Sequence, residues 1–190
     1  MLCACPRGTG QLQGQAIERK GKTMVEYKNI LICTDFSDDA NIAFIHALNL
    51  AKKCGAHLHI LHVPHSSFTY SRQIVDEHIP EGKSQEGQAF FDEEIAAEAE
   101  KDLRQTYEGR LGEFKDHTFV VRCGAPDVEI IRYAKKHDID LIVMGALGKS
   151  ELDRMVHGST VANVSRYAHC HVMAIRNPAK QFTLPGKMYS

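Results

Sequence analysis

The sequence has almost no net charge and no long apolar run. Its 190 residues carry a formal net charge of −1, so no overall basic field favours a nucleic acid or an anionic membrane surface as partner. No stretch approaches the roughly 18 consecutive apolar residues that a membrane-spanning helix needs. We therefore expect a protein that binds no nucleic acid and has no membrane span.

The six cysteines form no C-x-x-C pair, and metal binding by Cys3 and Cys5 is a minor alternative. Most of them lie in apolar or strand-like runs, where a cysteine is usually a small buried hydrophobic residue. Residues 1–23 lack the apolar centre of a secretory signal. These features predict a reducing compartment and a cytoplasmic location.

The chain divides into three parts by composition. Residues 1–23 are rich in Gly, Gln and basic residues without periodicity, so we expect a disordered extension there, or an upstream start with Met24 as the natural beginning. A hydrophobic content of 43% suits one domain, which we place at residues 24–177. Residues 178–190 form a loosely ordered C-terminal tail in this interpretation.

Strand and helix patterns alternate from Tyr27 onward. The predicted strands cover residues 27–35, 56–63, 117–123, 140–145 and 171–176. The predicted helices run from the Ser37 cap to Gly55 and over residues 86–110, 126–137 and 159–168, with a long loop over residues 64–85. This alternation predicts an α/β fold, an open five-stranded parallel sheet with helices on both faces.

Two predicted strand ends carry chemistry suited to a ligand. In open parallel sheets, ligands bind at the carboxyl ends of the strands, where the strand order reverses. The first strand ends in Thr34 and Asp35, which offer a hydroxyl and a carboxylate, and the fourth ends in Met144 and Gly145. If these two strands are neighbours, their ends meet at the crevice.

The loop after the fourth strand is rich in glycine. Gly145 and Gly148 allow the backbone to approach a ligand closely, residues 158–160 open a helix whose free N–H groups attract phosphate, and Lys149 adds a cation. A Walker P-loop matches poorly, because Val143 stands where its first glycine should be. A helix cap beside a flexible turn is the alternative when the loop is considered alone.

The spacing of these glycines gives a longer pattern. Gly145, Gly148 and Gly158-Ser159 fit G-x2-G-x9-G-[ST], which resembles the ATP-binding signature of the universal stress protein family. The resemblance extends from Met24 to Arg176 through four blocks, which begin "ILICTD", "LHILHV", "GAPDVEII" and "GSTVANVS". It implies an adenine nucleotide alpha hydrolase-like (Rossmann-like) fold with strand order 3-2-1-4-5. It also implies a homodimer that pairs through residues 171–176, from His171 to Arg176.

The resemblance also implies which residues hold the nucleotide. Asp35 would lie near the ribose and adenine, and Val63 would meet the adenine edge through its backbone. The implied nucleotide-binding residues are Thr34, Asp35, Val63, Met144, Gly145, Ala146, Leu147, Gly148, Lys149, Ser150, Glu151, Gly158, Ser159, Thr160 and Val161. Cys33 stands where relatives often have a proline, so the pocket wall beside Thr34 differs from theirs.

By the same resemblance the ligand is ATP, with AMP or ADP as alternatives. Phosphates usually bind with a divalent cation, so we expect Mg²⁺ or Mn²⁺ beside them, with Asp35 reaching the ion through water. Hydrolysis would also need a group that orients the attacking water. Glu151, Asp153 and His157 are the available side chains in the loop, but nothing in the sequence fixes their geometry. We assign no catalytic residue and predict a stress-response regulator with an unidentified protein partner and at most slow ATP hydrolysis. A weak ATPase and an AMP-bound or nucleotide-free interaction module are the alternatives.

Histidines crowd the second predicted strand. His57 and His59 share one face of this strand, whereas His62 points to the other face. Three side chains so arranged cannot converge on one zinc ion without a bend in the strand. We therefore expect hydrogen-bonded or surface histidines instead of metal ligands.

Overall fold

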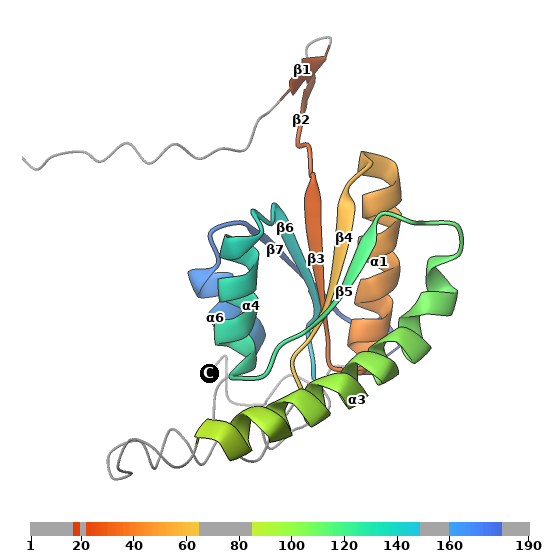
Figure 1. The fold of residues 1–190 in the computed structure, drawn as a ribbon. Helices are drawn as coiled ribbons and strands as arrows, with labels where there is room; N and C mark the ends of the chain where they lie inside the picture. Colours follow the sequence, from red (N-terminus) through yellow and green to blue (C-terminus); the bar gives the residue numbers. More distant parts are fainter. Residues whose placement is uncertain (1–16, 20–21, 65–84, 149–159, 180–190) are drawn as a thin grey trace, which may run out of the picture.

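A five-stranded parallel sheet forms the centre of the domain (Figure 1). The computed structural model describes residues 17–19, 22–64, 85–148 and 160–179. The strands are β3 (Asn29–Thr34), β4 (His57–His62), β5 (His117–Val121), β6 (Leu141–Gly145) and β7 (His171–Ile175). They lie in the order β5-β4-β3-β6-β7, which confirms the predicted order 3-2-1-4-5.

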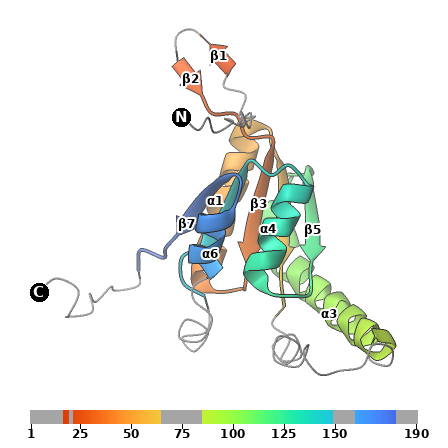
Figure 2. The same cartoon turned by 90° about the vertical axis from the view of Figure 1, so that its left-hand side faces the viewer.

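Two helices cover each face of the sheet (Figures 1 and 2). Helices α1 (Asp38–Cys54) and α3 (Gln85–Leu111) lie on one face, and α4 (Pro126–Lys136) and α6 (Thr160–Tyr167) lie on the other. Of the predicted long loop, residues 65–84 lie outside the described residues. No helix in the described ranges combines the length and the apolar character needed to cross a lipid bilayer.

The sequence of the central strand β3 is continuously apolar because helices cover both faces of the sheet. Ile30 and Ile32 pack toward α1 and α3 with Phe44, whereas Leu31 and Cys33 pack toward α4 and α6. A parallel strand covered on both faces buries every side chain, so alternation between polar and apolar residues is lost.

Helix α1 begins and ends at the residues that the sequence predicted. The Ser37 side chain accepts a hydrogen bond from the backbone N–H of Ala40 (3.2 Å), as a helix N-cap does. Gly55 ends the helix in the left-handed conformation, with φ of 66°. The first turn of α1 is therefore fixed directly beside the end of β3.

The described part of the amino-terminal segment contains two short strands. Strands β1 (Ile17–Arg19) and β2 (Lys22–Met24) form an antiparallel pair that projects from the domain beyond the start of β3 (Figures 1 and 2). Five of these six positions fall within residues 1–23, and the disordered extension expected there stays a prediction. A pair of neighbouring strands satisfies its backbone groups locally, without the apolar pattern that would have predicted it.

Candidate functional site

The strand order places the candidate site at the carboxyl ends of β3 and β6. From β3 the chain continues to β4 and β5 on one side of the sheet, and β6 and β7 lie on the other side. The order therefore reverses between β3 and β6, where Cys33 is in register with Met144. This is the position at which open parallel sheets bind their ligands.

Asp35 and Gly148 meet at this position. A Cβ atom added to Gly148 would lie 3.0 Å from Oδ2 of Asp35. The other carboxylate oxygen, Oδ1, accepts the backbone N–H of Ser37 (3.0 Å). The structure thus brings together two predicted site residues that are 113 positions apart in the sequence, with the Asp35 carboxylate beside an exposed stretch of glycine backbone.

Thr34 takes part in a buried hydrogen-bond network. Its Oγ1 accepts the backbone N–H of Phe36 (3.0 Å) and lies 2.6 Å from the hydroxyl of Tyr107, with which it shares a hydrogen bond. Burial raises the pKa of Tyr107, so its phenol stays protonated at neutral pH. Thr34 therefore connects the end of β3 to α3.

The sequence did not predict the aromatic group that lies beside Asp35. Phe36 has a positive φ of 61°, which is uncommon for a residue with a side chain. Its ring lies 4.5 Å from that of His62, and His62 Nδ1–H donates to the carbonyl oxygen of Thr34 (2.7 Å). The only sequence signal was the position of Phe36 directly after Asp35.

Gly145 packs against the first turn of α1. A Cβ atom there would lie 2.7 Å from the backbone nitrogen of Ala40 and 3.0 Å from the carbonyl carbon and Cβ of Asp39. Such contacts are too short, so only glycine allows β6 to end here against the helix. Packing within the protein thus accounts for this glycine, while the predicted approach of Gly145 to a ligand stays a prediction.

The two residues after Gly145 are held by hydrogen bonds. The backbone N–H of Ala146 donates to the carbonyl oxygen of Ile175 in β7 (2.7 Å). The backbone N–H of Leu147 donates to Oδ2 of Asp39 (3.1 Å), and the Ser37 hydroxyl donates to the Leu147 carbonyl oxygen (3.4 Å). The start of the glycine loop is therefore fixed on both sides.

Three further predicted residues converge on the α4 and α6 face. Met144 is buried in the apolar cluster of this face, and Val63 and Val161 are half-buried against it. Cys33 belongs to the same cluster, and burial raises the pKa of its thiol, which keeps it neutral. At position 33, where relatives often have a proline, the pocket wall of this chain is therefore also apolar.

Thr160 is the first residue of α6 and is half-buried. This helix is joined to α4 by a hydrogen bond from Nδ2 of Asn163 to Oδ2 of Asp127 (2.6 Å). The remaining predicted loop residues lie outside the described residues. They are Lys149, Ser150, Glu151, Asp153, His157, Gly158 and Ser159.

The histidines of β4 are hydrogen-bonded within the protein, as expected. His57 Nδ1–H donates to Asp116 Oδ1 (2.5 Å), and His59 Nδ1 shares a hydrogen bond with the hydroxyl of Tyr133 (2.9 Å). His62 lies on the opposite face of the strand, near Phe36. Within the described ranges, no group of three or more His, Cys, Asp or Glu side chains is arranged to hold a metal ion.

The sequence matches the profile of the universal stress protein family over residues 26–176. It is 33% identical over 168 residues to universal stress protein MJ0531 of Methanocaldococcus jannaschii, which covers 87% of this chain and 91% of that protein. It is 27% identical over 156 residues to universal stress protein MJ0577 of the same organism, covering 80% and 96%.

Solved structures show the same architecture. The universal stress protein UspA from Lactobacillus plantarum superposes with a TM-score of 0.56 at 30% identity, covering 80% of this chain and 100% of that one. The structure of MJ0577 gives 0.58 at 26% identity, covering 82% and 100%. A universal stress protein in complex with cAMP gives 0.50 at 23% identity, covering 79% and 97%, and at this identity the likeness concerns the fold.

Proposed function

The chain belongs to the universal stress protein family, and we propose that it binds ATP, or another adenine nucleotide, at the carboxyl ends of β3 and β6. The observation that carries this proposal is the approach of the Gly148 backbone to the Asp35 carboxylate. It combines an acceptor for hydroxyl groups with backbone that carries no Cβ, at the reversal of strand order.

In this proposal Asp35 accepts hydrogen bonds from the ribose hydroxyls, a role that suits a carboxylate at the end of a parallel strand. The backbone of residues 145–151 then curves around the ribose and the phosphates. Thr34 contributes through its backbone, because Phe36 and Tyr107 already occupy its hydroxyl.

The adenine ring would lie on the apolar side of the crevice. Val63 and Val161, half-buried against the cluster that contains Met144, offer apolar surface for a flat heteroaromatic ring. The backbone of Val63 would bind the polar edge of that ring. A universal stress protein was solved in complex with cAMP, itself an adenine nucleotide, and this supports the choice of base.

The phosphates would lie at the start of α6. The first N–H groups of a helix have no partner within the helix, and its dipole favours an anion there. Gly158 and Ser159 precede α6, which begins at Thr160, and Lys149 would add a positive charge.

A divalent cation would bind together with the phosphates. The described residues contain no cluster of three ligating side chains. Mg²⁺ commonly keeps several waters and binds through one or two carboxylates plus phosphate oxygens. Asp35 would reach such an ion through water, and Mn²⁺ would fit the same arrangement.

We expect a regulator rather than an enzyme. In this proposal, nucleotide binding changes the conformation of the glycine loop and thereby a surface for a protein partner. Slow hydrolysis would be a side activity, because Oδ1 of Asp35 already accepts the N–H of Ser37. The loop side chains that could orient water, Glu151, Asp153 and His157, lie outside the described residues. The cysteine usage favours the cytoplasm as its location.

The edge strand β7 supports the proposed homodimer. The carbonyl oxygen of Ile175 accepts the N–H of Ala146, which follows β6. The backbone groups of Ile175 therefore point toward β6. The backbone groups of Ala174 therefore point to the free edge of the sheet, since successive residues alternate. An edge of this kind can pair with a second copy of the chain.

Calorimetric titration with MgATP tests the proposed site. We expect Asp35→Ala to weaken ATP binding at least tenfold, because the ribose loses its acceptor, while the fold is kept. Gly148→Ala should weaken it as well, because a methyl group would enter the narrow space beside Asp35. Gly109→Ala is the control, because a Cβ on this exposed residue of α3 meets nothing within 4 Å.

If both site variants bind ATP like the wild type, the nucleotide lies elsewhere. Mass spectrometry of the nucleotide released from the purified protein separates the alternatives. ATP supports the regulator, whereas AMP or no nucleotide supports an interaction module. Single-turnover hydrolysis at roughly 1 per second or faster would identify an enzyme instead.

A further inference from the structure

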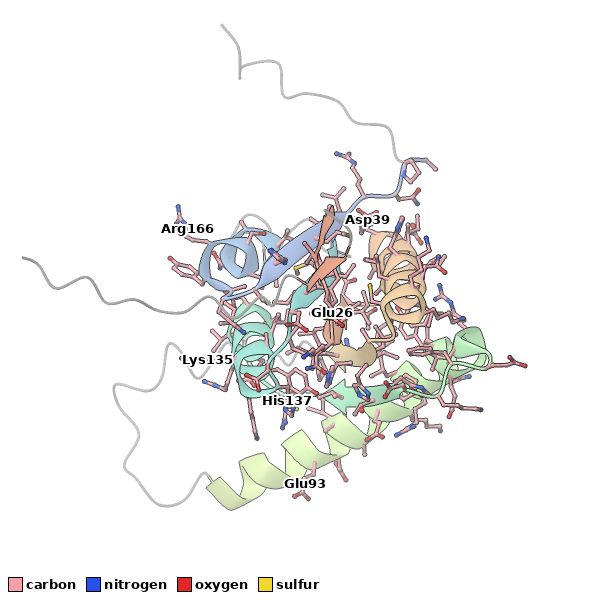
Figure 3. All side chains as sticks on the ribbon, turned by 90° about the horizontal axis from the view of Figure 1, so that it is seen from above. Glu26, Asp39, Glu93, Lys135, His137 and Arg166 are labelled. Carbon is pink, nitrogen blue, oxygen red and sulfur yellow. The ribbon has the colours of Figure 1, made fainter. Side chains whose placement is uncertain are left out.

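Asp39 is a carboxylate that is completely buried, with an exposed fraction of 0%. Acidic side chains are almost never fully buried unless a partner compensates for the lost hydration. The Asp39 side chain accepts the backbone N–H of Leu147 through Oδ2 (3.1 Å). Figure 3 shows Asp39 between α1 and the sheet, whereas Arg166 lies on the outer side of α6.

The first turn of α1 holds the peptide groups of Leu147 from both directions. Asp39 accepts the N–H of Leu147, and the Ser37 hydroxyl donates to its carbonyl oxygen. The same turn contacts Gly145 so closely that a Cβ there would lie 2.7 Å from the backbone nitrogen of Ala40. The helix thus determines the path of the chain over residues 145–147.

The next residue, Gly148, reaches the Asp35 carboxylate. Leu147, the residue directly before Gly148, therefore has both its N–H and its carbonyl oxygen bonded to the first turn of α1. Without the Asp39 carboxylate, the N–H of Leu147 would lose its acceptor. The backbone of Gly148 would then no longer be held beside Asp35 from the α1 side. On the other side, Ala146 is bound to β7, so Asp39 supplies the contact from the α1 side.

We propose that Asp39 is a positioning residue of the nucleotide site: its buried carboxylate anchors the Leu147 peptide to the start of α1 and so holds Gly148 beside Asp35. This inference rests on the proposed function. Asp39 touches no ligand in this arrangement and acts through the loop backbone.

Three variants separate anchoring from charge and from general damage. Asp39→Ala removes the acceptor, Asp39→Asn keeps a carbonyl oxygen of the same reach, and Asp38→Ala removes an exposed carboxylate from the same turn. We expect Asp39→Ala to weaken MgATP binding at least tenfold in calorimetry. Asp39→Asn should remain within threefold of the wild type, and Asp38→Ala should be unchanged.

Hydrogen exchange of the Leu147 amide, measured by NMR without nucleotide, tests the anchor itself. We expect exchange at least tenfold faster in Asp39→Ala than in the wild type or Asp38→Ala. If Asp39→Ala does not fold, the wild type decides: protection of the Leu147 amide that increases with ATP supports the inference, and exchange at the rate of an unprotected amide overturns it.

The two proposals fail in different ways. Wild-type affinity in a folded Asp39→Ala protein would overturn the role of Asp39 and leave nucleotide binding intact. A wild-type protein that binds no ATP would overturn the proposed function and, with it, the role of Asp39 toward nucleotide. Loss of ATP binding in Asp39→Asn equal to that in Asp39→Ala would also contradict anchoring, because the carbonyl oxygen should replace the lost acceptor.

Discussion

His59 makes the stability of the fold depend on pH. The residue is 8% exposed, and its Nε2 atom is buried without a hydrogen-bond partner among the described residues. Burial, followed by the neighbouring His57 and His137, lowers its pKa from 6.5 to about 4, and Asp116 opposes this only in part. The folded protein therefore keeps this imidazole neutral under conditions in which the unfolded chain protonates it.

The sign and the size of the effect follow from this shift. Between pH 6.5 and about 4 the unfolded state binds a proton that the folded state does not, so stability is complete above the upper value and falls as the pH drops. Each pKa unit corresponds to about 1.4 kcal/mol, which gives a total of about 3 kcal/mol. Between pH 7 and pH 5 the loss should be about 2 kcal/mol.

Urea unfolding at pH 7, 6 and 5, at one protein concentration, measures this loss. His59→Gln removes the titrating group, so the variant should lose about 2 kcal/mol less than the wild type between pH 7 and pH 5. His46→Gln, which replaces an exposed histidine of α1 and keeps His59, is the control. If the His59→Gln protein shows the wild-type dependence on pH, the reasoning is refuted.

Three further changes test the packing and the assembly. Gly145→Ala forces a methyl group against the first turn of α1 and should lower the free energy of unfolding in urea by roughly 1–3 kcal/mol. Gly109→Ala, where a Cβ meets no such contact, should not lower it. Equal stability of the two variants would contradict the packing. Tyr107→Phe removes the hydroxyl bound to the buried Thr34 and should lower the free energy of unfolding by roughly 1–2 kcal/mol. An unchanged midpoint of urea unfolding would show that this hydrogen bond contributes nothing to stability. Ala174→Pro removes an N–H from the free edge of β7 and should give monomers in light scattering at micromolar concentration with an unchanged circular dichroism spectrum; a dimer that persists would place the interface elsewhere.

The elements of the fold could be predicted because their signals are local. The Ser37 cap and the Gly55 terminus of α1 depend on a few neighbouring residues, and both are confirmed. The strands of the sheet are short apolar runs separated by helical patterns, so a parallel sheet could be predicted from the pattern. The strand order, which the structure confirms, came from the family resemblance.

The details of the site could be predicted only in part, because they depend on contacts between distant segments. Asp39 had the pattern of an ordinary acidic residue in a first helical turn, and its burial arises from the end of β6, more than 100 residues away. The hydroxyl of Tyr107 and the ring of Phe36 likewise acquire their positions beside Asp35 only when α3 and β4 pack.

Titration of nucleotide-free wild-type protein with MgATP in a calorimeter tests nucleotide binding most directly. We predict saturable binding of one ATP per chain, which the Asp35→Ala protein loses at the same concentrations. A folded wild-type protein that shows no saturable binding of ATP, ADP or AMP would contradict the assignment of an adenine nucleotide site to the carboxyl ends of β3 and β6.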